Sequence, residues 1–537
     1  MRLGIDFGTT RTVVAGCLDG RHPVATFDLG GEYRDYVPGV AAVDEDGVHY
    51  GWEAVARLGR TGEHEGRAST PALALRSIKR LVSTLAADEP VSELGGEISA
   101  LELATGFLAH LRRLLVEHSN FEPISDDEAL EVEVAVPAHS SSRQRYITLE
   151  AFTRAGFTVV GMRNEPTAAA VELAYRNRTM VSRRSPKRYV MIYDLGGGTF
   201  DTSAVSLEGR RFEVVATSGI SRLGGDDFDE VIADMTLAKL GAAAGALAPG
   251  EQVALRELCR EAKENLGPHS RRLMVDVAAL IPDADPVILP VADIYERCEP
   301  LVQQTLACLD EVFAALPAHG IDPGEARELG ALYLVGGAVA FPLVARALRA
   351  AGKRSEAGER RPGARAWGRK IQLAPAPHTS TAVGLAVCAD PDTRVHVREA
   401  VTRHFGVWRE AEGGREKVFD PILTKNQALD RHGGLTVHRR YRPAHAVGRL
   451  RFLECDRLTG AGQPAGELTP WTRIDFPYAP ELADSGDLSN LPVERCSAPL
   501  AEEIAETYTY GDDGTVAVEI ENLTHGYRRS FVLGTLR

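Results

Sequence analysis

Two stretches of this chain share an unusual arrangement that restricts the fold more than any other feature. Residues 4–16 read GIDFGTTRTVVAG, and residues 189–204 read YVMIYDLGGGTFDTSA. Each combines a β-rich run, an aspartate at its end, a Gly-Thr turn and a second β-like segment. Turns of this kind expose backbone N–H groups that can cradle phosphates. Two such hairpins predict two related lobes that close on one nucleotide; the alternative is two unrelated glycine-rich hairpins.

A third glycine segment favours the two-lobed interpretation. Residues 332–348 read LYLVGGAVAFPLVARAL, which predicts a buried strand, a Gly-Gly turn and a helix with apolar positions at 3.6-residue spacing. Glycines at such a turn let the backbone approach a flat nucleoside closely. The three segments in this order therefore predict a nucleotide site.

Charge and cysteine content exclude several other classes. The 537 residues carry a net charge of −14, which disfavours nucleic acid or an anionic membrane as the main partner. The 7 cysteines are scattered and form no C-x-x-C pair, which argues against a disulfide framework and a zinc ribbon. No secretory leader or long apolar run is recognisable in the sequence. We therefore expect a cytoplasmic protein.

Six segments of the chain carry a family resemblance. Their order resembles that in the nucleotide-binding domain of the 70-kilodalton heat-shock chaperones of the DnaK type, within the wider actin, hexokinase and chaperone ATPase fold. The resemblance covers about residues 1–388. The segments are GIDFGTT (4–10), VAVPAHSSSRQR (134–145), NEPTAAAVELAY (164–175), YDLGGGTFDTSAV (193–205), RLGGDDFDEVIADM (222–235) and LVGGAVAFP (334–342).

The resemblance implies a two-lobed, actin-like α/β ATPase built from duplicated ribonuclease-H-like lobes, about 1–183 and 184–388. Residues 389–400 are expected to form a linker that lacks the family's aliphatic docking run. Residues 401–537 consist of short β-patterned segments, with Asp512, Asp513 and Gly514 marking a hairpin, and predict an all-β, sandwich-like domain for a substrate or partner. No helical pattern follows, so the family's C-terminal helical lid is expected to be absent.

Carried over residue by residue, the resemblance implies how a nucleotide is held. The expected ligands are ATP or ADP and Mg²⁺, with the ion held through water by Asp6 and Asp194. Backbone amides of the two Gly-Thr turns would hold the phosphates. The residues expected to contact the nucleotide are Gly8, Thr9, Thr10, Arg11, Gly196, Gly197, Gly198, Gly224, Gly225, Lys263, Gly336, Gly337 and Ala338.

Catalytic and relay roles follow from the same resemblance. Lys79, in LRSIKRLVST, matches a lysine that contacts the γ-phosphate and the attacking water. Glu165, Thr199 and Asp201 match positions that orient or deprotonate that water, and positioning with charge stabilisation is most of what phosphoryl transfer requires. Pro137 and Arg145 match the family's switch proline and its relay arginine. These two would transmit the nucleotide state towards the second domain.

Several residues near the expected base depart from the family pattern. Ala338 and Ala340 stand where the family has a serine and an arginine, and Arg260 stands where it has a glutamate. His378 replaces an acidic residue. The basic segment 352–370 is longer than the family's connection and predicts a surface loop. We expect discrimination between ATP and GTP to weaken, unless Phe341 stacks on the base.

The predicted function is therefore that of a cytoplasmic, chaperone-like ATPase that couples hydrolysis to the binding of polypeptide clients. The resemblance also implies a J-domain co-chaperone and a nucleotide exchange factor as partners. The alternative is a non-hydrolysing, nucleotide-dependent scaffold or regulator with one dedicated protein partner. The altered base pocket and linker favour this alternative, whereas the retained acidic residues and Lys79 oppose it. A small-molecule kinase or an actin-like filament would leave the β-rich C-terminal region unexplained.

Overall fold

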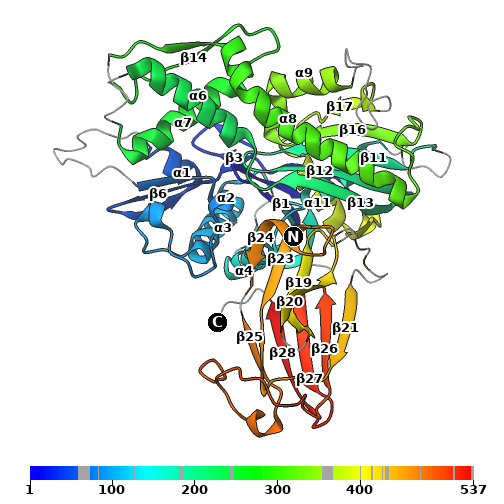
Figure 1. Cartoon of the computed structure of the whole chain (residues 1–537). Coiled ribbons are helices and arrows are strands. Elements are labelled where there is room, and N and C mark those ends of the chain that lie inside the picture. Colours follow the sequence, from blue (N-terminus) through cyan, green and yellow to red (C-terminus); the bar gives the residue numbers. More distant parts are fainter. Residues whose placement is uncertain are drawn as a thin grey trace. The chain divides into compact units, whose positions relative to one another are not determined.

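The structure is a computed structural model with two compact units (Figure 1). Unit 1 comprises Met1–Ala138 and Ile147–Val397, and unit 2 comprises His139–Tyr146 and Arg398–Arg537. The parallel strand pairs lie in unit 1. The structure describes residues 1–537 except 59–72, 83, 122–123, 126–127, 178–179, 181–184, 242–246, 282, 353–366, 400, 413–414, 426, 428, 430–433, 472, 512–513 and 534–537.

The first lobe of unit 1 is built on a mixed sheet that begins with the hairpin predicted at residues 4–16. Strand β1 pairs antiparallel with β2 and parallel with β9. Helix α3 begins at a capping box, in which Ser99 accepts from the Glu102 N–H and the Glu102 side chain accepts from the Ser99 N–H. The sheet runs β10 (Thr158–Asn164), β9 (Glu131–Val136), β1 (Arg2–Phe7), β2 (Arg11–Gly16), β5 (Val37–Pro38).

Smaller elements of this lobe surround the sheet. The short strands are β3 (Phe27–Asp28) with β4 (Tyr33–Arg34), and β7 (Gly47–Tyr50), β6 (Val40–Asp44) and β8 (Leu73–Arg76) in that order. The helices are α1 (Gly51–Val55), α2 (Ile78–Val82), α3 (Ala100–His118), α5 (Glu165–Arg176), α11 (Ser380–Ala389) and the short 3₁₀ helix η1 (Ser92–Leu94). Helix α4 (Ser142–Arg154) begins in unit 2 and belongs to unit 1 from Ile147 onward.

The second lobe repeats the arrangement of the first. Strand β11 pairs antiparallel with β12, placing Asp194 opposite Asp201, and parallel with β16. The predicted strand, turn and helix of residues 332–348 are confirmed as β16, a short 3₁₀ turn η4 (Gly337–Ala340) and α9 (Pro342–Ala351). The sheet order is β17 (Ile371–Leu373), β16 (Leu329–Val335), β11 (Tyr189–Leu195), β12 (Phe200–Glu208), β13 (Arg211–Ile220), β18 (His396–Arg398).

Helices of the second lobe pack on this sheet and hold its largest hydrophobic cluster. The cluster includes Phe200, Phe228 and Phe313, all fully buried. The remaining elements are α6 (Gly225–Leu240), α7 (Pro249–Glu264), α8 (Val291–Ala315), the hairpin β14 (Arg272–Val275) with β15 (Val287–Pro290), and the 3₁₀ turns η3 (Leu316–His319) and η5 (Pro391–Thr393).

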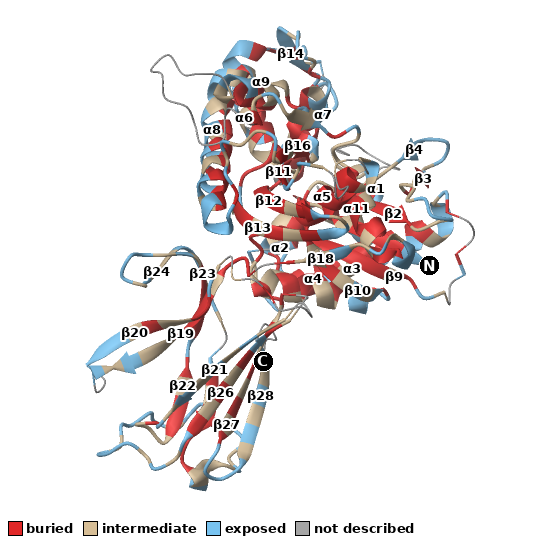
Figure 2. Cartoon of the chain, turned by 90° about the vertical axis from the view of Figure 1, so that its right-hand side faces the viewer, coloured by how far each residue is buried: buried red, intermediate tan, exposed pale blue. Residues whose placement is uncertain are grey.

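Two helices with small side chains, α5 and α11, pack tightly against each other and the sheets. Ala168, Ala169 and Ala170 of α5 are fully buried, and a Cβ at Gly384 of α11 would lie only 1.9 Å from the Ala168 carbonyl oxygen. Any larger residue at Gly384 would force the helices apart. The alanines of the NEPTAAA segment are therefore explained by this close helix contact, and Figure 2 shows the two helices largely buried.

The segment expected to be a linker forms the edge strand β18 of the second-lobe sheet. The His396 N–H donates to the Arg210 carbonyl oxygen at 2.9 Å. Val395 and Val397 pack against the cluster that contains Val205 and Phe212. Two valines thus occupy this sheet edge, although the longer aliphatic run of the family is missing.

Unit 2 contains antiparallel sheets only, as far as its strand pairs are described. The predicted hairpin near Gly514 joins β26 to β27, while Asp512 and Asp513 lie outside the described residues. The sheets are β20 (Glu416–Leu423), β19 (His404–Ala411), β23 (Phe452–Leu458), β24 (Pro464–Pro470); β21 (Leu435–Tyr441), β26 (Ile504–Tyr510), β27 (Val516–Asn522), β28 (Tyr527–Leu533); and β22 (Val447–Leu450) with β25 (Ile474–Pro477), beside the 3₁₀ turn η7 (Pro480–Leu482).

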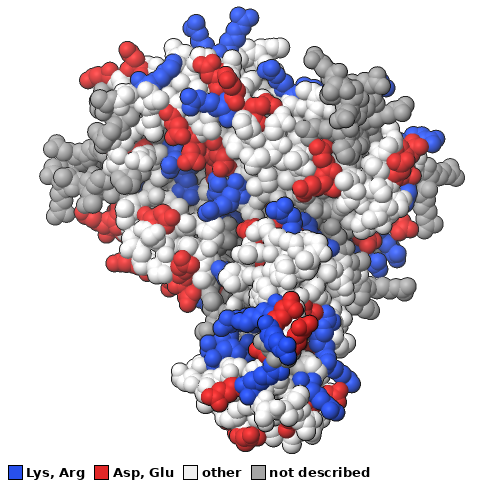
Figure 3. Space-filling model, viewed as in Figure 1, with Lys and Arg blue, Asp and Glu red and all other residues white. Residues whose placement is uncertain are grey.

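A buried carboxylate ties the two larger sheets of unit 2 together. Glu506 of β26 is fully buried and accepts hydrogen bonds from Arg409 at 2.6 Å, Tyr441 at 2.6 Å and Tyr508 at 2.7 Å. Arg409 also pairs with Asp420 at 2.7 Å. On the face seen in Figure 3, basic side chains of this unit gather in a band, with acidic side chains among and beside them. Among the described helices of the chain, none combines the length and the apolar character needed to cross a bilayer.

We expect acid to destabilise unit 1 through His110 of α3. Burial lowers the pKa of the His110 imidazole to about 4, whereas an unfolded histidine titrates near pH 6.5. The unfolded state therefore takes up the proton first, and the free energy of unfolding should fall by about 3 kcal/mol between pH 6.5 and 4. Urea midpoints measured across this range should show a shallower slope for His110→Gln. The exposed His118, at the end of the same helix, supplies the control His118→Gln, and an unchanged slope in His110→Gln would contradict the assignment.

Candidate nucleotide-binding site

One cleft in unit 1 collects most of the residues predicted to hold a nucleotide. The two Gly-Thr turns and helices α2, α5 and α7 contribute to its walls, together with the β16–α9 turn. The lining residues are Asp6, Gly8, Thr9, Thr10, Arg11, Lys79, Glu165, Asp194, Gly196, Gly197, Thr199, Gly225, Asp229, Arg260, Lys263, Glu264, Gly336, Gly337, Ala338, Ala340, Phe341, Pro377, His378 and Thr381.

The turns of the two hairpins interleave at the floor of this cleft. A Cβ on Gly197 would lie 1.8 Å from the Thr10 hydroxyl oxygen, so only glycine fits at this position. Gly225 and Asp226 donate their backbone N–H groups to the carbonyl oxygens of Gly196 at 2.9 Å and Gly197 at 2.7 Å. The start of α6 thereby supports the second turn from behind, and the N–H groups of both turns remain close together.

Lys79 and Glu165 form a buried ion pair inside the cleft. The Lys79 ammonium donates to Glu165 Oε1 at 2.6 Å, and the two side chains are only 5% and 11% exposed. Lys79 comes from α2, whereas Glu165 is the first residue of α5, where Pro166 suits the first turn of a helix. The pair is anchored by two short segments far apart in sequence.

Asp6 and Asp194 end the first strands of the two hairpins and lie near this pair. Burial, together with the neighbouring Glu165, raises the pKa of Asp6 to about 7. Burial also raises the pKa of Asp194 well above its usual value, and the same cause raises that of Glu165. Three buried carboxylates beside one ammonium suit an additional cation. These carboxylates fit a hydrated Mg²⁺, which keeps several of its waters and needs only one or two carboxylates. Among the described residues, no group of three potential metal ligands is found.

Five of the predicted site residues do not line the cleft. Gly198 packs against Thr9, and Gly224 packs against Gly197; both shape the turns from behind. Asp201 is 2% exposed and lies opposite Asp194 in the hairpin. The two predicted relay residues fall in different units, because Pro137 belongs to unit 1 and Arg145 to unit 2.

Within unit 2, the segment that contains Arg145 has well-defined partners. The Ser142 N–H and hydroxyl donate to Glu454 at 3.0 and 2.6 Å. A Cβ on Gly514 would meet the Arg145 side chain at 2.9 Å. This arrangement surrounds Arg145 with residues of the β-rich region, but its relay role stays a prediction.

The nucleoside end of the cleft is dominated by charges on α7. Lys263 donates to the Gly225 carbonyl oxygen at 2.8 Å and pairs with Asp229 at 2.7 Å. Arg260 donates to Glu257 at 2.8 Å and to Glu264 at 2.9 Å. These cations are therefore already engaged by protein groups.

Phe341 does not replace the missing arginine over the base. It is 3% exposed and packs against Phe228, with ring centroids 5.0 Å apart, and against Tyr295 at 5.5 Å. The neighbouring Ala340 is exposed and lines the cleft. Because the ring of Phe341 is held in the core, stacking on a purine would require it to leave these partners.

Comparison with known proteins supplies the family. The model of the Hsp70 protein family matches residues 76–362, which is more than half of the chain. The chain belongs to the Hsp70 family. Proteins named Chaperone protein HscA homolog are similar to it: that of Bordetella petrii is 32% identical over 367 residues, which are 65% of this chain and 53% of the relative. That of Burkholderia pseudomallei is 30% identical over 363 residues, 64% of this chain and 53% of the relative. The matched part thus spans about half the length of these curated relatives.

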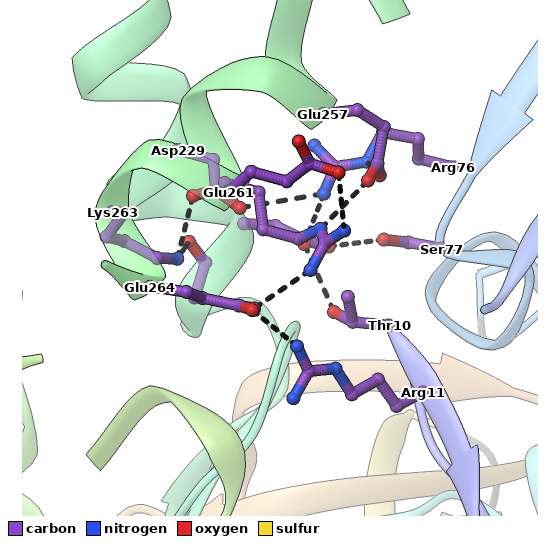
Figure 4. Close-up of polar contacts among 12 residues, drawn as sticks. Thr10, Arg11, Arg76, Ser77, Asp229, Glu257, Glu261, Lys263 and Glu264 are labelled. Carbon is purple, nitrogen blue, oxygen red and sulfur yellow. Dashed lines mark hydrogen bonds and ion pairs between the residues drawn. The ribbon is translucent and has the colours of Figure 1, made fainter. Parts of the chain in front are cut away.

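A network of polar contacts between the two lobes was not predicted for this Hsp70 member. Figure 4 shows Arg76 and Ser77 of the first lobe facing residues of α6 and α7. Arg76 pairs with Glu257 at 2.5 Å, and Arg80 pairs with Asp227 at 3.0 Å. Arg11 pairs with Glu264 and stacks on the Tyr36 ring at 4.4 Å.

The sequence held only part of the signal for this network. The acidic run in RLGGDDFDE stood directly after the Gly-Gly pair, but acidic residues in a first helical turn are common for reasons of the helix dipole alone. The basic partners lie about 150 residues earlier in the chain, and nothing in their local pattern identifies them.

We expect this Hsp70 member to discriminate weakly between purines. The side chains of Ala338 and Ala340 offer the base no hydrogen bond or cation, and the ring of Phe341 is held by Phe228 and Tyr295, so affinities for ATP and GTP should differ by less than about tenfold. Isothermal titration with ATP, GTP and triphosphate would measure this. Ala340→Arg should raise the preference for ATP, whereas Ala350→Arg, on the exposed side of α9, is the control. Rejection of GTP by more than about a hundredfold in the unmodified protein would show that other groups read the base.

Proposed function

We propose that this chain is a Mg²⁺-dependent ATPase of the chaperone type, which couples hydrolysis to the binding of polypeptide clients through unit 2. The observation that carries the proposal is the buried Lys79–Glu165 pair, 2.6 Å apart, beside the two phosphate turns. Burying an ion pair costs desolvation free energy, so such a pair contributes little to stability. A ligand that meets these charges would explain why the pair is buried here. Membership of the Hsp70 family supports ATP as that ligand.

The chain's own residues would act as follows in this proposal. N–H groups of the turns at residues 8–11 and 196–199 bind the phosphates, and Lys79 neutralises charge at the γ-phosphate. Glu165, with Thr199 and Asp201, orients or accepts a proton from the attacking water. Asp6 and Asp194 would hold Mg²⁺ through water molecules. The bound ion would supply charge neutralisation for the phosphates.

Client binding through unit 2 is a separate part of the proposal. Its support is the antiparallel β architecture, which follows the ATPase unit as in the family that the chain resembles. A J-domain co-chaperone, a nucleotide exchange factor and a cytoplasmic location are proposed on the same family grounds.

A non-hydrolysing scaffold or regulator is the second candidate. The observation that favours it is the nucleoside end of the cleft, where Arg260 and Lys263 are engaged by Glu257, Glu264 and Asp229. A protein that binds nucleotide only to hold one conformation needs the phosphate turns but not the catalytic lysine. Turnover measurements therefore separate the two candidates.

Removing the charges of the catalytic centre should abolish most of the turnover. We expect Asp6→Asn or Lys79→Ala to lower the rate of phosphate release at least about tenfold, which corresponds to about 1.4 kcal/mol in the barrier. Steady-state phosphate release would be measured at saturating ATP, with circular dichroism to verify folding. Lys417→Ala, at an exposed position in unit 2, serves as the control. Equal turnover in all four proteins would contradict the roles given to Asp6 and Lys79, whereas no turnover in the unmodified protein would favour the scaffold.

The coupling between nucleotide and client binding is expected to be weak, so nucleotide should alter client affinity only slightly. The linker offers two valines to the sheet edge rather than a long aliphatic run, and a ligand shifts an equilibrium only by its differential affinity for the two states. Fluorescence anisotropy with a labelled extended peptide, with ATP or ADP present, should give dissociation constants within about tenfold of each other. A loss of peptide affinity of about a hundredfold with ATP would reveal strong coupling by another route.

A further inference from the structure

Asp226, the second residue of α6, joins three segments of the nucleotide site. Its side chain is 14% exposed. Its carboxylate accepts hydrogen bonds from the Ser77 hydroxyl and, at 3.3 Å, from the Thr10 hydroxyl. Its backbone N–H donates to the Gly197 carbonyl oxygen at 2.7 Å. One residue of the second lobe therefore touches both phosphate turns and the segment that leads into α2.

The backbone of Ser77 explains why this contact matters. Ser77 has φ +63°, a left-handed conformation that residues other than glycine seldom adopt. Such a conformation persists only where surrounding contacts hold it. Two backbone bonds fix the next turn, from Ile78 N–H to the Gly39 carbonyl oxygen and from Leu81 N–H to the Ser77 carbonyl oxygen, both at 3.1 Å. The hydroxyl is held from the opposite lobe, by Asp226; Figure 4 shows Ser77 directed towards that lobe.

Lys79 follows Ser77 by two residues, in a helix of only 5 residues. So short a helix has little intrinsic stability, and tertiary contacts decide where it begins. If Ser77 relaxed to an ordinary conformation, the start of α2 would turn and the Lys79 ammonium would move away from Glu165. The reach of Lys79 into the cleft thus depends on a contact that the second lobe provides.

We infer that Asp226 is a positioning residue for ATP hydrolysis: by holding the Ser77 hydroxyl across the cleft, it places Lys79 when the two lobes are closed. This inference rests on the proposed ATPase function. Asp226 does not touch the reacting groups in this arrangement, since it lies behind the Thr10 and Gly197 turns. The Ser77–Asp226 hydrogen bond is consequently the contact, among those between the lobes, that links lobe closure to the placement of Lys79.

Single-turnover hydrolysis and nucleotide binding in four variants test the inference. Asp226→Ala and Ser77→Ala should each lower the hydrolysis rate about tenfold, because both remove the same hydrogen bond. The dissociation constant for ATP should change less than about threefold in each, since the backbone groups of both turns are retained. The double variant should be no slower than Asp226→Ala, because the Ser77 hydroxyl has already lost its partner when Asp226 is replaced. Asp226→Asn, which keeps an acceptor oxygen for Ser77, should recover part of the rate.

Two further measurements separate positioning from a general loss of structure. Amide hydrogen exchange at Leu81, whose N–H bonds to Ser77, should accelerate in both alanine variants while exchange in β11 stays unchanged. Asp234→Ala removes an exposed aspartate of the same helix α6 and should leave the hydrolysis rate as it is. Ser77→Ala keeps the test decisive if Asp226→Ala fails to fold.

The outcomes distinguish this inference from the function on which it rests. If Lys79→Ala does not slow hydrolysis, the proposed ATPase function fails. If Lys79→Ala is slow but Asp226→Ala and Ser77→Ala hydrolyse ATP at the unmodified rate, the positioning role is wrong and the function stands. Additive effects in the double variant, or weaker ATP binding with an unchanged hydrolysis rate, would likewise overturn the positioning role.

Discussion

The close approach of two glycine turns is the constraint on which unit 1 depends. Gly197 lies so near the Thr10 hydroxyl that a Cβ would overlap it at 1.8 Å. This contact sets the spacing between the two hairpins, and with it the spacing of Asp6 and Asp194 at the ends of their strands. The sheets behind the hairpins are mixed and deeply buried, so the turns rest on rigid supports. Precise placement of phosphate-binding N–H groups requires such a frame.

Electrostatics gives the cleft its chemical character. Burial raises the pKa of Asp6, Glu165 and Asp194, because each carboxylate has lost water and faces other carboxylates. Lys79 compensates only part of this charge. An arrangement that is costly without a bound cation and favourable with one suits a site whose ligand arrives with Mg²⁺. The charged side chains of α7 differ, since their partners are supplied by the protein itself. The carboxylates beside Lys79 and the charged side chains of α7 are therefore neutralised in different ways.

Much of the fold could be predicted from the sequence, because short continuous segments carry the patterns that identify its elements. The hairpins at residues 4–16 and 189–204, and the strand, turn and helix at 332–348, combine β-rich or periodic patterns with glycine turns that few other structures use. The structure of the linker was harder to predict from sequence. Strand β18 is short, and it is held at the β13 edge of the sheet by the packing of two valines. Nothing in its own pattern distinguishes that pairing from an exposed connector.

The sequence by itself determined the family, the two Gly-Thr turns and the identities of most cleft residues, because each of these resides in a short motif whose spacing is set by a strand and a turn. Only the tertiary structure decided what lies across the cleft. The pairing of Arg76 with Glu257, the burial of Phe341 and the bond from Ser77 to Asp226 join residues that are far apart in the chain. These contacts form only when the two lobes lie against each other. A local sequence pattern cannot show which residues of one lobe face which residues of the other.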